Sequence, residues 1–124
     1  MSTSGVSQRY IEALASAAEE RGALDAVQAD IEGLDELLAS SEDLQGYAED
    51  VFILPEHKEE TFRRLFEGKM NELTLNFLVL LCQKRRAQFL AEILTGCLAH
   101  MNQRRGIATA EVTSATELSA AQLD

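Results

Sequence analysis

The segment from Leu73 to Cys82 is apolar at most positions, and this limits what the chain can form. It is too short to span a bilayer, which takes about 20 apolar residues in a helix. A run of this length is either a buried strand or a buried helix. We predict a helix, because leucine outnumbers the β-branched residues and the neighbouring segments have helical patterns. Such a helix lies in the middle of a bundle or leaves an apolar strip exposed.

Two long amphipathic helices are predicted ahead of this run. Ser4 or Ser7 caps the first, which extends to about Arg21 and stops at Gly22. Its apolar stripe, at helical spacing, consists of Val6, Tyr10, Ala13, Leu14 and Ala17. The second helix has apolar residues three and four apart, at Leu24, Val27, Ile31, Leu34 and Leu38. Its opposite face is acidic, and we expect that face to be solvated.

Two shorter helices follow in the pattern. The Ser40–Ser41 pair interrupts the spacing and offers an N-cap for a third helix that ends by Glu49. Pro55 suits the first turn of a fourth helix, because the missing N–H has no helical partner there. The predicted buried edge of this fourth helix consists of Phe62, Leu65 and Phe66. Gly68 or Asn71 then ends the helix or restarts the chain.

The run from Leu73 to Cys82 is the fifth predicted helix, and a sixth is predicted beyond the basic segment Lys84–Arg86. Its apolar stripe consists of Phe89, Leu90, Ile93, Leu94, Cys97, Leu98 and Met101. The helix ends near Arg104–Gly106. In the tail, Ala110–Thr113 is typical of a short strand, and Leu118–Leu123 of the start of a helix.

We therefore expect an all-α fold with two unequal parts. Residues 1–106 are predicted to form a six-helix bundle. Residues 107–124 are predicted to be a linker and the start of a C-terminal domain that stops early. The length of 124 residues fits one domain and leaves little room for a second.

The chain is acidic, with 21 acidic and 11 basic residues and a net charge of −10. This disfavours nucleic-acid binding, which needs a basic face, and docking onto anionic lipid. Residues 1–70 hold 16 of the acids and 6 of the bases, whereas residues 71–124 are neutral overall. Contact surface is therefore expected in the second half. The polar start Met1–Gly5 lacks the apolar region of a secretory signal.

Side chains that carry chemistry are sparse. Cys82 and Cys97 form no CxxC pair and fall in apolar runs, so we predict two reduced, partly buried thiols. His57 and His100 are far apart and unpaired, which favours ordinary surface or edge positions over metal binding or catalysis. A phosphotransfer role for His100 has little support from its neighbours. We expect no enzyme activity, no metal and no cofactor.

An apolar surface is the feature that indicates a function. On the first helix, Ala13 and Ala17 lie beside Tyr10 and Leu14, and small residues next to a rigid ring leave a shallow groove. The fifth helix has more apolar area than one neighbour covers, with Val79 and Leu80 between the polar residues Asn76 and Gln83. Such a strip suits an amphipathic partner helix. The alternative is that all these residues are core.

Several segments resemble one family when taken in order. Arg9–Leu14 resembles the family's opening Arg-Tyr-Ala-x-Ala-Leu, and Pro55 with the residues after it resembles its fourth-helix entry. Asn76–Leu78, followed by Leu80, Leu81 and Arg86, resembles an Asn-x-Leu segment, and Val112–Ala115 resembles the entry to a second domain. The family is the delta subunit of the F-type ATP synthase, whose mitochondrial counterpart is the oligomycin-sensitivity-conferring protein. The resemblance covers nearly the whole chain but only about two-thirds of a family member.

The resemblance implies a non-catalytic stator subunit of the peripheral stalk. Its six-helix domain would cap the catalytic head and hold the N-terminal helix of an alpha subunit in a groove between the first and fifth helices. Carried over by position, the groove consists of Tyr10, Ala13, Leu14, Ala17, Asn76, Val79, Leu80 and Gln83. The missing C-terminal domain would bind the b subunits, at the cytoplasmic face of a bacterial inner membrane, with no membrane insertion of its own.

Two departures from the family accompany this resemblance. Ile11 replaces a usual alanine, which could alter packing beside Tyr10. The C-terminal domain is absent, and we interpret the chain as a fragment rather than a naturally shortened relative, because the tail begins a domain it does not finish. An alternative function is a helical adaptor or secretion chaperone. A chaperone would dimerise, whereas we expect the isolated domain to be monomeric.

Overall fold

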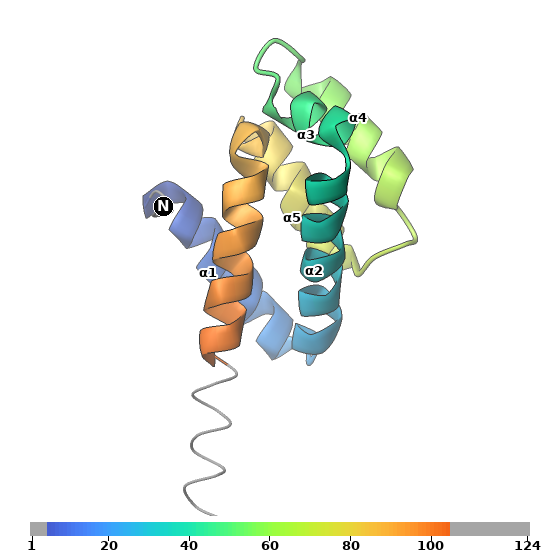
Figure 1. The fold of residues 1–124 in the computed structure, drawn as a ribbon. Coiled ribbons are helices and arrows are strands. Elements are labelled where there is room, and N and C mark those ends of the chain that lie inside the picture. The colour runs from blue at the N-terminus through green and yellow to red at the C-terminus, as the bar shows by residue number, and fades with distance from the viewer. Residues whose placement is uncertain (1–4, 105–124) are drawn as a thin grey trace, which may run out of the picture.

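The structure, a computed structural model, describes residues 5–104 apart from the Val6 side chain. Its helices are α1 (Gly5–Glu20), α2 (Leu24–Ser40), α3 (Glu42–Glu49), α4 (Pro55–Phe66) and α5 (Glu72–Gln83). A 3₁₀ turn over Ala87–Phe89 leads into a last helix over residues 90–104 (Figure 1). The described residues contain no strand, which confirms the predicted all-α bundle. The strand and helix start predicted in the tail lie outside the described residues.

Helix α5 lies at the centre of the bundle, as its apolar sequence predicted. It contacts α1, α2 and α4. Its buried residues are Thr74, Leu75, Phe77, Leu78, Val79, Leu81 and Cys82. The last helix lies between α1 and α2 in Figure 1. Arg104 Nε pairs with Glu19 Oε1 of α1 at 2.8 Å, and Gln28 Nε2 of α2 donates to Asn102 Oδ1 at 3.0 Å.

Local signals predicted the starts of α3, α4 and α5 and the stop after α1, whereas Ser7, one of the two predicted caps of the first helix, lies inside α1. The Ser41 hydroxyl accepts a hydrogen bond from the Leu44 N–H at 3.2 Å, and Pro55 is the first residue of α4. Asn71 accepts from the Leu73 N–H at 2.9 Å and so caps α5. Gly22 follows α1 with a φ of 64°, a left-handed conformation that glycine adopts without steric cost.

The buried edge of α1 differs from the predicted stripe. It consists of Ser7, Ile11, Leu14, Ala15 and Ala18. Ala13 is exposed, and Tyr10 and Ala17 are only half-buried. The helix is thus turned so that Ile11 enters the core. This orientation buries a large, wholly apolar side chain beside two alanines that allow close packing, and it leaves Tyr10 half-buried.

Beyond α1, two residues that were predicted as core are exposed, and a lysine is buried. Leu65 is 42% exposed, and Phe89, in the 3₁₀ turn, is 38% exposed. On α4, Phe62 is buried as predicted, and Lys58, one turn earlier, is also buried. The Lys58 ammonium donates to the Ala48 carbonyl at 2.8 Å, which satisfies it at the end of α3. Both cysteines are free thiols, and they are fully buried rather than partly buried as predicted.

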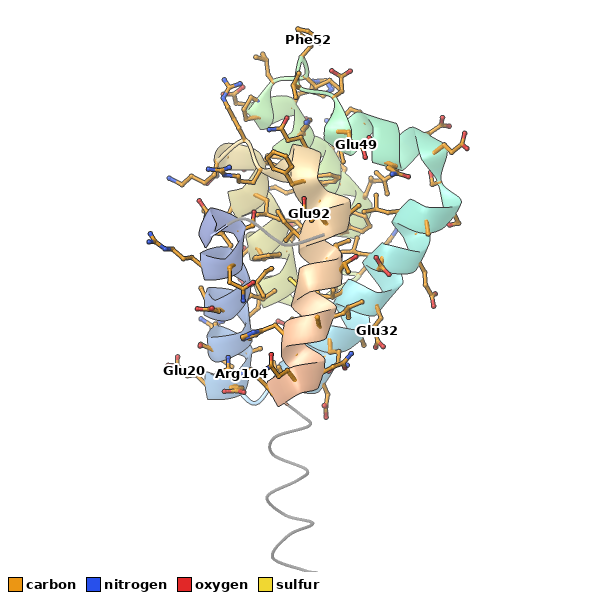
Figure 2. All side chains as sticks on the ribbon, turned by 60° about the vertical axis from the view of Figure 1, so that its left-hand side comes forward. Glu20, Glu32, Glu49, Phe52, Glu92 and Arg104 are labelled. Carbon is orange, nitrogen blue, oxygen red and sulfur yellow. The ribbon has the colours of Figure 1, made fainter. Side chains whose placement is uncertain are left out.

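The connection between α3 and α4 carries the most exposed apolar side chains. Phe52 is 92% exposed and Leu54 is 64% exposed. Phe52 projects from the end of the bundle (Figure 2). Asp50 Oδ1 accepts from the Phe52 N–H at 2.9 Å, which shapes the turn without burying the ring. Within residues 5–104, no helix is long and apolar enough to cross a membrane.

Candidate functional site

The predicted groove residues lie on two helices that contact each other, α1 and α5. On each helix they are spaced i, i+3, i+4 and i+7, so each set forms a stripe along one side of its helix. The α1 stripe consists of Tyr10, Ala13, Leu14 and Ala17. The α5 stripe consists of Asn76, Val79, Leu80 and Gln83.

Each stripe follows the border between core and solvent. Leu14 and Val79 are each 5% exposed and belong to the core. The half-buried members are Tyr10, Ala17 and Leu80. The exposed members are Ala13, Asn76 and Gln83. Two of the eight residues are therefore core, and six are at least partly accessible.

Helix α4 borders the C-terminal end of the α5 stripe. Gln83 Nε2 donates to Glu59 Oε1 at 3.1 Å, and Glu59 also pairs with Arg63 Nε at 3.2 Å. The Gln83 amide is thus held toward α4 in the unbound chain. Ile11, the predicted source of altered packing beside Tyr10, is instead fully buried in the core.

A separate cavity, which the sequence did not predict, lies along the last helix. It measures about 700 Å³ and is lined by Gln8 of α1, Glu49 of α3 and a series of residues between Gln88 and Gln103. The signal that could have revealed it is the spacing of Ala91, Thr95 and Ala99. Small residues four apart leave a shallow face on a helix.

The cysteines and histidines within residues 5–104 are Cys82, Cys97, His57 and His100. Burial raises the pKa of both Cys82 and Cys97 to about 12, so neither thiol is an activated nucleophile. His57 is exposed, and the His100 Nε2 lies 3.3 Å from the Arg104 Nη1. Among residues 5–104, no group of three or more histidine, cysteine or acidic side chains is arranged to hold a metal ion.

The comparisons with known proteins identify the family. The family model of the ATP synthase delta (OSCP) subunit matches residues 6–124. The chain belongs to this family. It is 38% identical to ATP synthase subunit delta of Chlorobium luteolum, over 98% of the chain and 67% of that relative. It is 41% identical to ATP synthase subunit delta of Thermosynechococcus vestitus, over 91% of the chain and 61% of that relative.

The resemblance inferred from the sequence is thereby confirmed, and the family finding favours an ATP synthase subunit over an adaptor or secretion chaperone. The chain spans roughly two-thirds of the length of these relatives, between 61% and 67%. The division at residue 106 and the eight groove residues stay predictions, because no observation on the described residues tests them.

Proposed function

We propose that this chain is a stator subunit of the peripheral stalk of an F-type ATP synthase, without catalytic activity of its own. Its bundle binds the N-terminal helix of an alpha subunit at the top of the catalytic head. The observation that carries this proposal is the pair of stripes on α1 and α5. Each stripe places apolar, half-buried residues next to exposed small or polar ones. The two helices that carry the stripes contact each other, and the chain belongs to the delta-subunit family.

The mechanism is helix-in-groove binding. Tyr10 and Leu80 supply apolar surface that an incoming helix covers, at roughly 25 cal/mol per Å² before ordering costs. Ala13 and Ala17 add little bulk, which lets the backbone of a partner helix approach α1 closely. Asn76 and Gln83 supply side-chain donors and acceptors along the edge, and they fix the register of the partner.

The remaining parts of the proposal follow from the family and the length of the chain. A C-terminal domain beyond the bundle binds the b subunits, so that the whole subunit links head to stalk and resists rotor torque. The chain is peripheral to the membrane, at the cytoplasmic face if the source is bacterial. The isolated bundle is monomeric, because the chain carries a net charge of −10 that opposes self-association.

A peptide titration tests the groove. A synthetic peptide of the N-terminal helix of the cognate alpha subunit is added to this chain, and amide NMR follows the shifts. We expect saturable binding, with shifts concentrated on α1 and α5. Ala13→Glu places a charge in the groove at an exposed position, so we expect binding to weaken at least tenfold while the bundle stays folded.

Ala26→Glu is the matched control, because Ala26 is exposed on α2. It should bind the peptide like the unmodified chain. Tyr10→Asp and Leu80→Asp extend the test to the half-buried positions, with circular dichroism to confirm folding. Unchanged affinity in Ala13→Glu and in both of these folded variants would exclude the proposed groove.

A further inference from the structure

An apolar groove runs along the outer face of the last helix. It is the cavity of about 700 Å³, and its floor includes Ala91, Thr95, Gly96 and Ala99. Figure 2 views this face, with Glu92 on the helix and Glu49 of α3 above it. Phe89, 38% exposed, lines one end and Gln103 the other. These ends are 14 residues apart, or about 21 Å at 1.5 Å per residue.

Two of the side chains that line this groove are acidic, and no lysine or arginine among the described residues lines it. Glu49 and Glu92 line it directly. A neighbouring hollow of about 450 Å³ shares His100 and Gln103 with it and adds Glu12 of α1. Among the described residues, Arg104 is the one Lys or Arg side chain that lines either hollow, and it is already paired with Glu19 at 2.8 Å. The groove therefore offers apolar surface with carboxylates at its sides.

We propose that this groove docks an amphipathic protein helix whose apolar face is flanked by lysine or arginine. The small floor residues let a helix backbone approach closely, and Phe89 covers part of its apolar face. Glu49, Glu92 and Glu12 then face the basic side chains of the partner. The length of the groove matches about four helical turns.

The same charges disfavour the other possible occupants. A second copy of this chain brings a net charge of −10 to an acidic groove. Residues 105–124 of the chain contain three acidic residues and one basic residue, so they also carry the wrong sign. An anionic lipid surface is repelled in the same way.

This surface is distinct from the proposed alpha-subunit groove. Gln8 and Glu12 lie on the side of α1 that faces the last helix. Tyr10, Ala13 and Ala17 lie on the opposite side of the same helix, given about 100° of rotation per residue. Binding at the two surfaces can therefore be abolished separately.

A designed peptide tests the proposal. The probe is a synthetic helix with alanine and leucine on one face and lysine on both flanks. One control peptide has glutamate in place of lysine, and another has glutamine in place of the apolar residues. We expect saturable binding of the probe alone, with NMR shifts concentrated on residues 88–103 and on Gln8 and Glu12.

Variants of the chain locate the site. Ala99 is exposed, so Ala99→Trp fills the groove without disturbing the core, and we expect a loss of affinity of about tenfold or more. Glu92→Lys reverses one charge and should weaken binding about two- to fivefold. Glu32→Lys, at an exposed position on α2, is the matched control and should have a smaller effect.

The outcomes separate this proposal from the alpha-subunit groove. Loss of probe binding in Ala99→Trp, with binding retained in Ala13→Glu, supports the second groove. The reverse pattern places the probe at α1 and α5 and overturns the inference. Equal binding of the probe and of the glutamine control means attraction by charge alone, and it also overturns the inference.

Discussion

The carboxylate of Asp30 accepts a hydrogen bond from the buried hydroxyl of Thr74 at 2.9 Å, which joins α2 to the first turn of α5. The same oxygen accepts from the Asn71 N–H at 2.7 Å. A negative charge at the N-terminal end of a helix is also stabilised by the helix dipole. One acidic side chain of α2 therefore fixes where the central helix begins.

Removing this hydrogen bond should destabilise the bundle. Thr74→Val keeps the shape of the side chain but deletes the hydroxyl, and we expect the free energy of unfolding to fall by about 1–3 kcal/mol. Urea denaturation measures the change. Glu36→Ala, at an exposed position on α2, is the control and should change it by less than about 0.5 kcal/mol. A double-mutant cycle with Asp30→Ala that proved additive would contradict the coupling.

The ends of α1 and α5 share one motif with different residues at its left-handed position. After α1, Gly22 N and Ala23 N donate to Glu19 O and Ala18 O at 3.1 and 2.8 Å. After α5, Arg85 N and Arg86 N donate to Cys82 O and Leu81 O at 3.1 and 2.7 Å. Both are Schellman motifs, but Arg85 has a φ of 58°, where a Cβ is unfavourable.

Substitutions at Arg85 and Gly22 should change the free energy of unfolding in opposite directions. Arg85→Gly relieves the unfavourable conformation, so we expect a gain of about 0.5–1 kcal/mol in the free energy of unfolding. Gly22→Ala introduces the same conformation and should lose about 1 kcal/mol. Thermal and urea unfolding measure both. A loss of stability in Arg85→Gly would mean that the arginine side chain contributes more than the backbone cost.

Two phenylalanines ten residues apart should respond differently to truncation. Phe62 is 1% exposed in the core, and Phe62→Ala should lower the free energy of unfolding by about 3–5 kcal/mol. Phe52 is 92% exposed, and Phe52→Ala should change it by less than about 0.5 kcal/mol. A large loss in Phe52→Ala would show that the α3–α4 connection is more buried in solution than in this structure.

Local features of the fold were predictable from the sequence, and long-range ones were not. The caps at Ser41 and Asn71 depend on neighbouring residues, and the apolar content of α5 requires a central position. The predicted core-facing side of α1 was wrong. Tyr10 and Ile11 both fit helical spacing, and only packing against other helices decides which of the two is buried. The same limit applies to Lys58, whose partner, the Ala48 carbonyl, belongs to another helix.

The two candidate sites also differ in whether the sequence could predict them. The α1 and α5 stripes could be proposed because each is a spacing pattern within one helix. The cavity along the last helix needs Gln8 and Glu49, from α1 and α3, beside residues 88–103. No periodicity brings those three segments together, so the groove emerged only from the fold.

Lys58 should be a stabilising residue despite its burial. Desolvation lowers its pKa, while its Nζ donates to the Ala48 carbonyl near the C-terminal end of α3. Lys58→Met removes the donor and leaves that carbonyl without this partner, so we expect a loss of about 1–3 kcal/mol in urea unfolding. Lys69→Met, at an exposed position, should be close to neutral. A stabilised Lys58→Met variant would instead show that desolvation outweighs the hydrogen bond.

The two buried thiols should make the bundle sensitive to alkali. Burial raises the pKa of Cys97 from 9.0 to about 12. Burial is also the main cause of the raised pKa of Cys82. At a pH between 9 and about 12, the unfolded chain releases the thiol proton, whereas the folded chain keeps it. Stability is therefore fully present below pH 9 and falls above it, by about 1.4 kcal/mol per pH unit for each thiol.

Cys97→Ala isolates this contribution. The variant is less stable near neutral pH, because it leaves a cavity in the core. Its stability should nevertheless fall less steeply, by about 1 kcal/mol less than that of the unmodified chain between about pH 8 and pH 10. Guanidinium unfolding at the two pH values measures the difference. Parallel losses in both proteins would mean that Cys97 ionises in the folded bundle as readily as in the unfolded chain.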